Sequence, residues 1–159
     1  IEGGNADIGF ALDSEIPGKL DAIRWKTLKP HLVAPCSHPL ASGRLVKLDE
    51  VARYPLITPP MGGKPSGSHQ ILHAMDDRGF PYKVSMESSN VELNSLYVKN
   101  GLGLAFAMVA AEEEINLQEG VAIVPLDLDV GEEYLSIFFR RERQKAPAVE
   151  RLTKFLLNS

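Results

Sequence analysis

The 159-residue sequence predicts an α/β fold, and the strongest evidence is a helix followed directly by a buried strand. Ser89 and Glu92 have the Ser-x-x-Glu spacing of a capping box, so we expect a helix to begin there. Apolar residues recur at helical spacing up to Lys99, and Gly101 stands where a helix ends in a left-handed residue. The next run, 102–109, is apolar almost throughout, which is typical of a strand buried on both faces of a mainly parallel sheet.

The rest of the chain alternates between strand-like and helix-like segments. Residues 20–28 alternate poorly and are left unassigned, and Ser68 is expected to cap the helix that follows it. This order predicts open, mainly parallel sheets with helices on both faces, in which ligands bind where strands end and helices begin. We expect strands at 6–12, 29–36, 56–58, 82–87, 121–126 and 134–140, and helices at 48–54, 68–79, 110–117 and from Pro147 onward.

Composition excludes several classes of function for these residues. A formal net charge of −4 with 24% charged residues leaves no excess of lysine or arginine, so this segment should not grip DNA phosphates itself. The single cysteine, Cys36, cannot form an internal disulfide, which suits a reducing compartment. No apolar run approaches the roughly 18 residues of a membrane span. Ile1 is not an initiator, and we expect an amino-terminal portion to precede it.

The sequence carries no set of residues that argues for catalysis or for metal binding. His69 and His73 could share a helix face as metal-ligating pairs do, but no acidic residue or cysteine at ligand spacing completes a site. The consecutive glutamates 112–114 are interpreted as a solvated helix face. Gly101 and Gly103 resemble a dinucleotide fingerprint, yet they follow a helix and precede a strand, the reverse of what that loop needs. We therefore expect no enzyme, no metal and no cofactor.

Five motifs, taken in their order and spacing, resemble one known family. They are Gly4-Asn5-Ala6-Asp7-Ile8-Gly9-Phe10, His38-Pro39-Leu40-Ala41, Leu48-Asp49-Glu50-Val51 with Tyr54-Pro55-Leu56-Ile57, Arg78-Gly79, and Val98-Lys99-Asn100-Gly101-Leu102-Gly103-Leu104-Ala105. With these motifs, nearly all of the chain resembles the effector-binding part of LysR-type transcriptional regulators.

The resemblance implies a two-lobed fold of the type 2 periplasmic-binding-protein class. Lobe one would hold residues 1–35 and 125–159 without its opening β-α-β unit, and lobe two would hold residues 36–124. Two crossover strands, 29–35 and 121–126, would join the lobes. The winged helix-turn-helix that binds DNA in the family is absent from this chain.

The family's mode of action is a further expectation from the resemblance. A small effector, often an anion or carboxylate, would bind between the lobes and shift how a homodimer or homotetramer presents its DNA-binding helices. Contact with DNA would pass only through the missing amino-terminal domain. The protein would be cytoplasmic, with no membrane partner.

The resemblance also points to effector-binding residues. It places Ser66 and Gly67 on a loop facing the ligand, with Ser88 and Ser89 at the start of the second helix. Leu12 stands where some members carry a hydroxyl, which indicates a partly apolar ligand. Ordinary capping and turn chemistry is the alternative explanation of the serines. The candidate effector site is Leu12, Thr58, Lys64, Ser66, Gly67, Ser88 and Ser89.

Two other functions fit the same fold. A free-standing periplasmic solute-binding protein for transport would share the lobes, and an enzyme could use the cleft between them. The motifs at 38–41 and 101–105 favour the regulator over the solute receptor. The missing acid–base residues argue against an enzyme.

Overall fold

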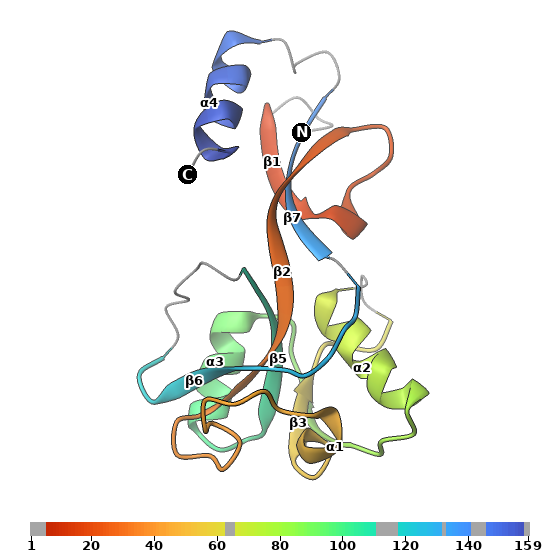
Figure 1. Cartoon of the computed structure of the whole chain (residues 1–159), viewed down its shortest axis with the longest axis vertical. Helices are drawn as coiled ribbons and strands as arrows, with labels where there is room; N and C mark the ends of the chain where they lie inside the picture. The colour runs from red at the N-terminus through yellow and green to blue at the C-terminus, as the bar shows by residue number, and fades with distance from the viewer. Residues whose placement is uncertain (1–5, 63–65, 111–117, 132, 141–145, 158–159) are drawn as a thin grey trace. The chain divides into compact units, whose positions relative to one another are not determined.

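Two units make up the chain in the computed structural model, which describes residues 6–62, 66–110, 118–131, 133–140 and 146–157. The smaller unit is Ile1–Leu28 with Glu132–Ser159, and the larger unit is Lys29–Gly131. Strand β2 (Asp21–Pro35) contributes its first half to the smaller unit and its second half to the larger one (Figure 1). Each unit has a hydrophobic core of its own.

The smaller unit is built on an antiparallel sheet in the order β1-β7-β2. Strand β1 (Ile8–Leu12) and strand β7 (Glu133–Phe139) pair with Ile8 opposite Phe139, and the short 3-10 helix η1 (Asp13–Glu15) follows β1. The register of β2 against β7 shifts between Arg24 and Lys26. This bulge interrupts the alternation of side chains, which explains why residues 20–28 gave no clear strand signal.

Helix α4 (Pro147–Leu157) completes the smaller unit and begins with the expected proline in its first turn. Val149 packs on Ile137 and Phe139 of β7. The apolar spacing of the sequence predicts a stripe of Val149, Leu152, Phe155 and Leu156 on this helix. Leu156 also packs on this core, whereas Leu152 and Phe155 are 45% and 70% exposed. Thr153, one turn after Val149, occupies the buried face instead, so the stripe is rotated relative to the sequence prediction.

The larger unit holds a mixed sheet in the order β4-β3-β5-β2, with β6 pairing β2 on its other side. Strand β3 (Pro55–Thr58) lies parallel to both β4 (Lys83–Glu87) and β5 (Leu104–Ala110). Strand β6 (Val121–Pro125) is antiparallel to β2. Among the described strands, β4, β3 and β5 pair in parallel, in that order. The sequence predicted sheets that are mainly parallel.

Helices cover both faces of this sheet, as the sequence predicted (Figure 1). Helices α1 (Leu48–Val51) and α2 (Gly67–Asp77) pack on the face that carries larger side chains, among them Leu56, Leu104 and Phe106. Successive residues of a strand point to opposite faces of the sheet. The strand residues that alternate with these larger side chains therefore face the helix that packs on the other side.

Helix α3 (Val91–Lys99) packs on the opposite face, where the strands present small residues. Val98 meets Ala105 and Ala107 of β5 there, and all three are buried. Gly101, the residue after the C-cap Asn100, has φ +76, and its N–H donates to the carbonyl of Val98 at 2.9 Å. The expected left-handed glycine cap is confirmed.

The lobe boundaries expected at residues 35 and 125 remain a prediction. His31–Pro35 of β2 pair with Val121–Pro125 of β6, and both segments lie inside the larger unit. The helix expected at 110–117 is not assessed, because Ala110 ends β5 and residues 111–117 lie outside the described part of the chain.

His38 organises the loop that leaves β2. Its Nδ1 accepts a hydrogen bond from the Leu40 N–H at 3.2 Å, and its ring meets the Tyr54 ring edge-on with 4.4 Å between centroids. Because Nδ1 accepts, the proton of the neutral ring is on Nε2. Burial lowers the pKa of His38 below its ordinary value of 6.5.

Gly67, the first residue of α2, lies against Met108 of β5. A Cβ built at Gly67 would be 2.0 Å from Met108 Cγ and 3.3 Å from Met108 Cβ. No side chain fits at residue 67 unless Met108 moves. The glycine therefore lets the start of α2 approach the sheet closely.

We expect Gly67→Ala to lower the free energy of unfolding by about 1–3 kcal/mol, the usual cost of overpacking. Alanine is the better helix former, so helix propensity alone would give the opposite sign. Adding Met108→Ala should recover part of the loss relative to the sum of the two single changes, as urea denaturation would measure. Gly18→Ala, whose Cβ would meet nothing within 4 Å, is the control. Unchanged or increased stability of Gly67→Ala would contradict the packing argument.

His38 should also make stability depend on pH. Its folded pKa is lowered, so the unfolded chain binds the proton more tightly and His38 favours folding fully above its unfolded pKa of about 6.5. That contribution is lost as the pH falls below about 6.5. Asparagine can still accept the Leu40 N–H, so urea unfolding of the original chain and of His38→Asn at pH 7.5 and 5.5 isolates the titration. The original chain should lose more stability on acidification than His38→Asn, and equal losses would refute this.

Candidate functional site

The amino ends of α2 and α3 lie at the same edge of the larger unit's sheet. Helix α2 follows β3 along the chain, and α3 follows β4. Because β3 and β4 are parallel, with Thr58 opposite Glu87, both strands end at this edge. The first turn of a helix offers free N–H groups and a partial positive charge, which together favour anions.

A backbone hydrogen bond ties the ends of the two strands together. The Ser88 N–H donates to the carbonyl of Thr58 at 2.8 Å, and Thr58 is only 2% exposed. Ser88 is half-buried and Ser89 is exposed. Of the expected site residues, the structure thus brings Thr58 and Ser88 into direct contact, with Ser89 beside them in the chain.

Ser66 caps α2, in place of the expected Ser68. The Ser66 N–H donates to His69 Nδ1 at 3.1 Å, and Ser66 Oγ lies 2.8 Å from the same nitrogen. Since Nδ1 accepts, the neutral ring carries its proton on Nε2, which lies 3.3 Å from the Pro60 carbonyl oxygen. His69 thereby takes the place of the glutamate of a capping box. The Ser68 hydroxyl instead donates to the Phe106 carbonyl at 3.3 Å, so the Ser68 cap was wrong.

Asn90 caps α3, in place of the expected Ser89. Its side-chain oxygen accepts the Leu93 N–H at 2.9 Å, and α3 begins at Val91. The predicted Ser89–Glu92 capping box was therefore wrong by one residue. The change leaves the exposed Ser89 hydroxyl outside the cap, at the edge where the helix begins.

Asn94 is a polar residue near this edge that sequence reasoning missed. It is 7% exposed, and its Nδ2 lies 3.5 Å from the Ser88 carbonyl oxygen. Its Oδ1 is buried and has no hydrogen-bond partner among the described residues. The signal that could have found it is its spacing, one helical turn after Asn90.

The two helix starts differ in charge. No acidic side chain lies in the first turn of α2, whereas the first turn of α3 contains Glu92. A carboxylate there partly offsets the positive end of the helix dipole. The start of α2 is therefore the more favourable end for an anion.

The remaining expected residues are less informative. Lys64 lies outside the described residues. Leu12 ends β1 of the smaller unit and is half-buried there.

The described residues offer no metal site and no membrane segment. No group of three histidine, cysteine, aspartate or glutamate side chains among them could hold a metal ion. His69 is engaged in the α2 cap, and His73 is exposed. Within the part of the chain that the structure describes, no helix has the length and apolar character needed to cross a bilayer.

Comparison with known proteins identifies the family. The family model "LysR substrate binding domain" matches residues 1–159. The HTH-type transcriptional regulator Cbl of Escherichia coli (strain K12) is 30% identical over 129 residues, which cover 80% of this chain and 39% of Cbl. The chain thus spans less than half the length of this curated relative.

Solved structures show the same fold. The LysR family transcriptional regulator HinK from Pseudomonas aeruginosa superposes with a TM-score of 0.80 at 17% identity, over 99% of this chain and 54% of HinK. The BenM effector binding domain with its effector benzoate has a TM-score of 0.71 at 18% identity, over 96% of this chain and 72% of that domain. The α/β architecture is therefore the type 2 periplasmic-binding-like fold, and the chain belongs to the LysR substrate-binding domain family.

Proposed function

We propose that this chain is the effector-sensing domain of a bacterial transcription regulator and that it binds a small carboxylate at the edge where α2 and α3 begin. The observation that carries the proposal is the shared edge itself, which the parallel pairing of β3 and β4 creates. The first turns of α2 and α3 can each donate N–H groups to the oxygens of one anion bound at this edge.

The side chains at this edge suit a carboxylate group. The hydroxyls of Ser88 and Ser89 can donate to its oxygens, as can that of Ser66 when it turns from His69 Nδ1 to the ligand. The first turn of α2 carries no competing negative charge. Lys64 would add a positive charge. The solved BenM domain holds benzoate, a carboxylate on an apolar ring, as its effector.

The response to the ligand would be a shift between conformations rather than a reaction. An effector that binds one arrangement of the domain more tightly raises the population of that arrangement. In the full protein this shift would be coupled to DNA binding by a separate amino-terminal domain within a cytoplasmic homodimer or homotetramer. The similarity to the regulator Cbl supports a regulator rather than an enzyme or a solute receptor.

Benzoate is the probe that tests the site. We expect the 159-residue chain to bind benzoate, and Ser66→Ala and Ser89→Ala each to weaken it by roughly tenfold, because a hydrogen bond to a charged group is lost. Isothermal titration calorimetry measures the affinity, and Ser42→Ala, an exposed serine of another loop, is the matched control. Absence of benzoate binding, or equal affinity in all three variants, would refute the site.

A further inference from the structure

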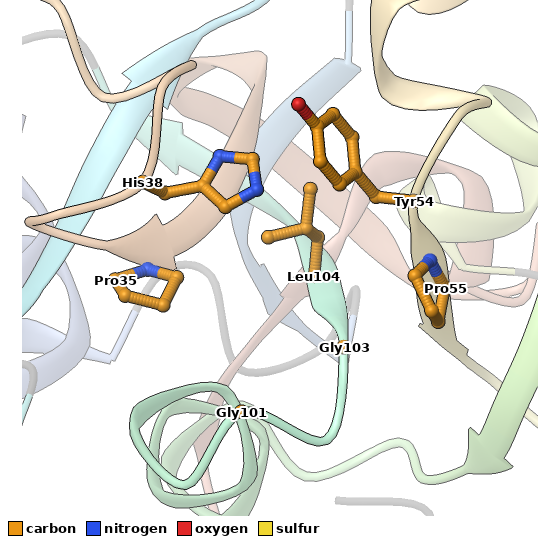
Figure 2. Close-up of a pocket in the computed structure, with 7 residues that line it drawn as sticks. All are labelled: Pro35, His38, Tyr54, Pro55, Gly101, Gly103 and Leu104. Atoms are coloured by element: carbon orange, nitrogen blue, oxygen red, sulfur yellow. The ribbon is translucent and has the colours of Figure 1, made fainter.

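A small pocket lies at the opposite edge of the larger unit's sheet, where β3 and β5 begin (Figure 2). Its volume is about 150 Å³, and its lining comes from three separate segments of the chain, 35–38, 54–55 and 101–104. Strand β3 is four residues long, which at about 3.3 Å per residue puts roughly 10 Å between this edge and the helix starts. The lining residues are Pro35, His38, Tyr54, Pro55, Gly101, Gly103 and Leu104.

The walls of the pocket are mainly apolar. The rings of Pro35 and Pro55 and the side chain of Leu104 provide hydrocarbon surface (Figure 2). Gly101 leaves room, since a Cβ built there would meet nothing within 4 Å. An engineered apolar cavity of about 150 Å³ holds one benzene molecule, whereas drug-sized ligands need about 300 Å³ or more. The pocket therefore fits a single ring.

His38 supplies a hydrogen-bond donor to this pocket. Its Nδ1 is occupied by the Leu40 N–H, so Nε2 carries the proton of the neutral ring. Figure 2 shows the ring nitrogen farther from the His38 Cβ turned toward Leu104 and Tyr54. Among the described residues, no hydrogen bond to this nitrogen is found, so it can serve a ligand.

The charge at this edge disfavours anions. Gly101 follows Asn100, the C-cap of α3, where the helix dipole ends in a partial negative charge that Lys99 of the last turn partly offsets. The lining contains no lysine or arginine that could pair with a carboxylate. A carboxylate desolvated without a cation is costly, so the pocket favours an uncharged ligand.

We propose that this pocket is a second ligand site, which binds a neutral single-ring molecule whose oxygen accepts a hydrogen bond from His38 Nε2. Phenol has this chemistry, with an aromatic ring for the apolar walls and one oxygen for His38. The site is separate from the carboxylate site and does not depend on it.

Phenol titration followed by two-dimensional ¹H–¹⁵N NMR tests the proposal on the 159-residue chain. We expect saturable shifts of the Gly101, Gly103 and Leu104 amide signals, with a Kd of the order of 1 mM for so small a ligand. Benzoate should leave these three signals unchanged. Its binding at the helix starts is read from other amides, so either site can fail without the other.

Two substitutions of His38 test its hydrogen bond to phenol separately from its role in holding the loop. His38→Asn can still accept the Leu40 N–H but removes the ring, and it should weaken phenol at least tenfold. His38→Phe keeps a ring but removes the donor, so it should weaken phenol about tenfold and leave benzene binding unchanged. His73→Asn, on the exposed side of α2, is the matched control and should change neither.

Three results would overturn the proposal. These are shifts from phenol confined to amides outside the pocket, an absence of saturation, and equal phenol affinity in the original chain and His38→Asn. The NMR spectrum also reports whether each variant is folded. If His38→Phe does not fold, His38→Asn and the comparison of phenol with benzene still decide the outcome.

Discussion

The parallel pairing of β3 with β4 and β5 is the constraint on which the larger unit depends. Parallel neighbours cannot be joined by a tight turn, so the chain must return across a face of the sheet each time. Helices α2 and α3 make these returns, one on each face. The starts of α2 and α3 consequently lie at one edge of the sheet and their ends at the other, which gives the two edges opposite electrostatic character.

Packing on the two faces follows from the side chains that β5 presents. Phe106 and Leu104 fill the space beneath α1 and α2, while Ala105 and Ala107 let α3 lie close. Gly67 likewise allows close packing at the start of α2, because a Cβ at this position would clash with Met108. The site edge is thus held by close contacts with β5.

Much of this fold could be predicted because its signals are local. Gly101 marks the end of α3 and Pro147 the start of α4 through backbone preferences that belong to single residues. The caps were harder, because Ser88, Ser89 and Asn90 can all serve as one. The choice of Asn90 depends on the bond from Ser88 to Thr58, which joins residues 30 positions apart in the sequence.

Parts of both proposed sites could not be predicted, because they too depend on contacts between residues far apart in the sequence. The Ser68 hydroxyl is engaged by Phe106, and the proposed pocket needs the end of β2, the loop with His38, the start of β3 and the end of α3. None of these segments indicates a pocket when taken alone.

Helix α3 runs from the edge of the sheet that holds one proposed site to the edge that holds the other. Its first turn offers N–H groups to an anion, whereas its last carbonyls are partly satisfied by the N–H groups of Gly101 and Leu102. The carboxyl end therefore keeps a weak negative charge but few free acceptors, and it adjoins proline and leucine surface. Such an edge would favour an uncharged ligand, whereas the other edge would favour a carboxylate. The two edges thus differ in their charge preference, so ligands of the two classes would not compete for either place.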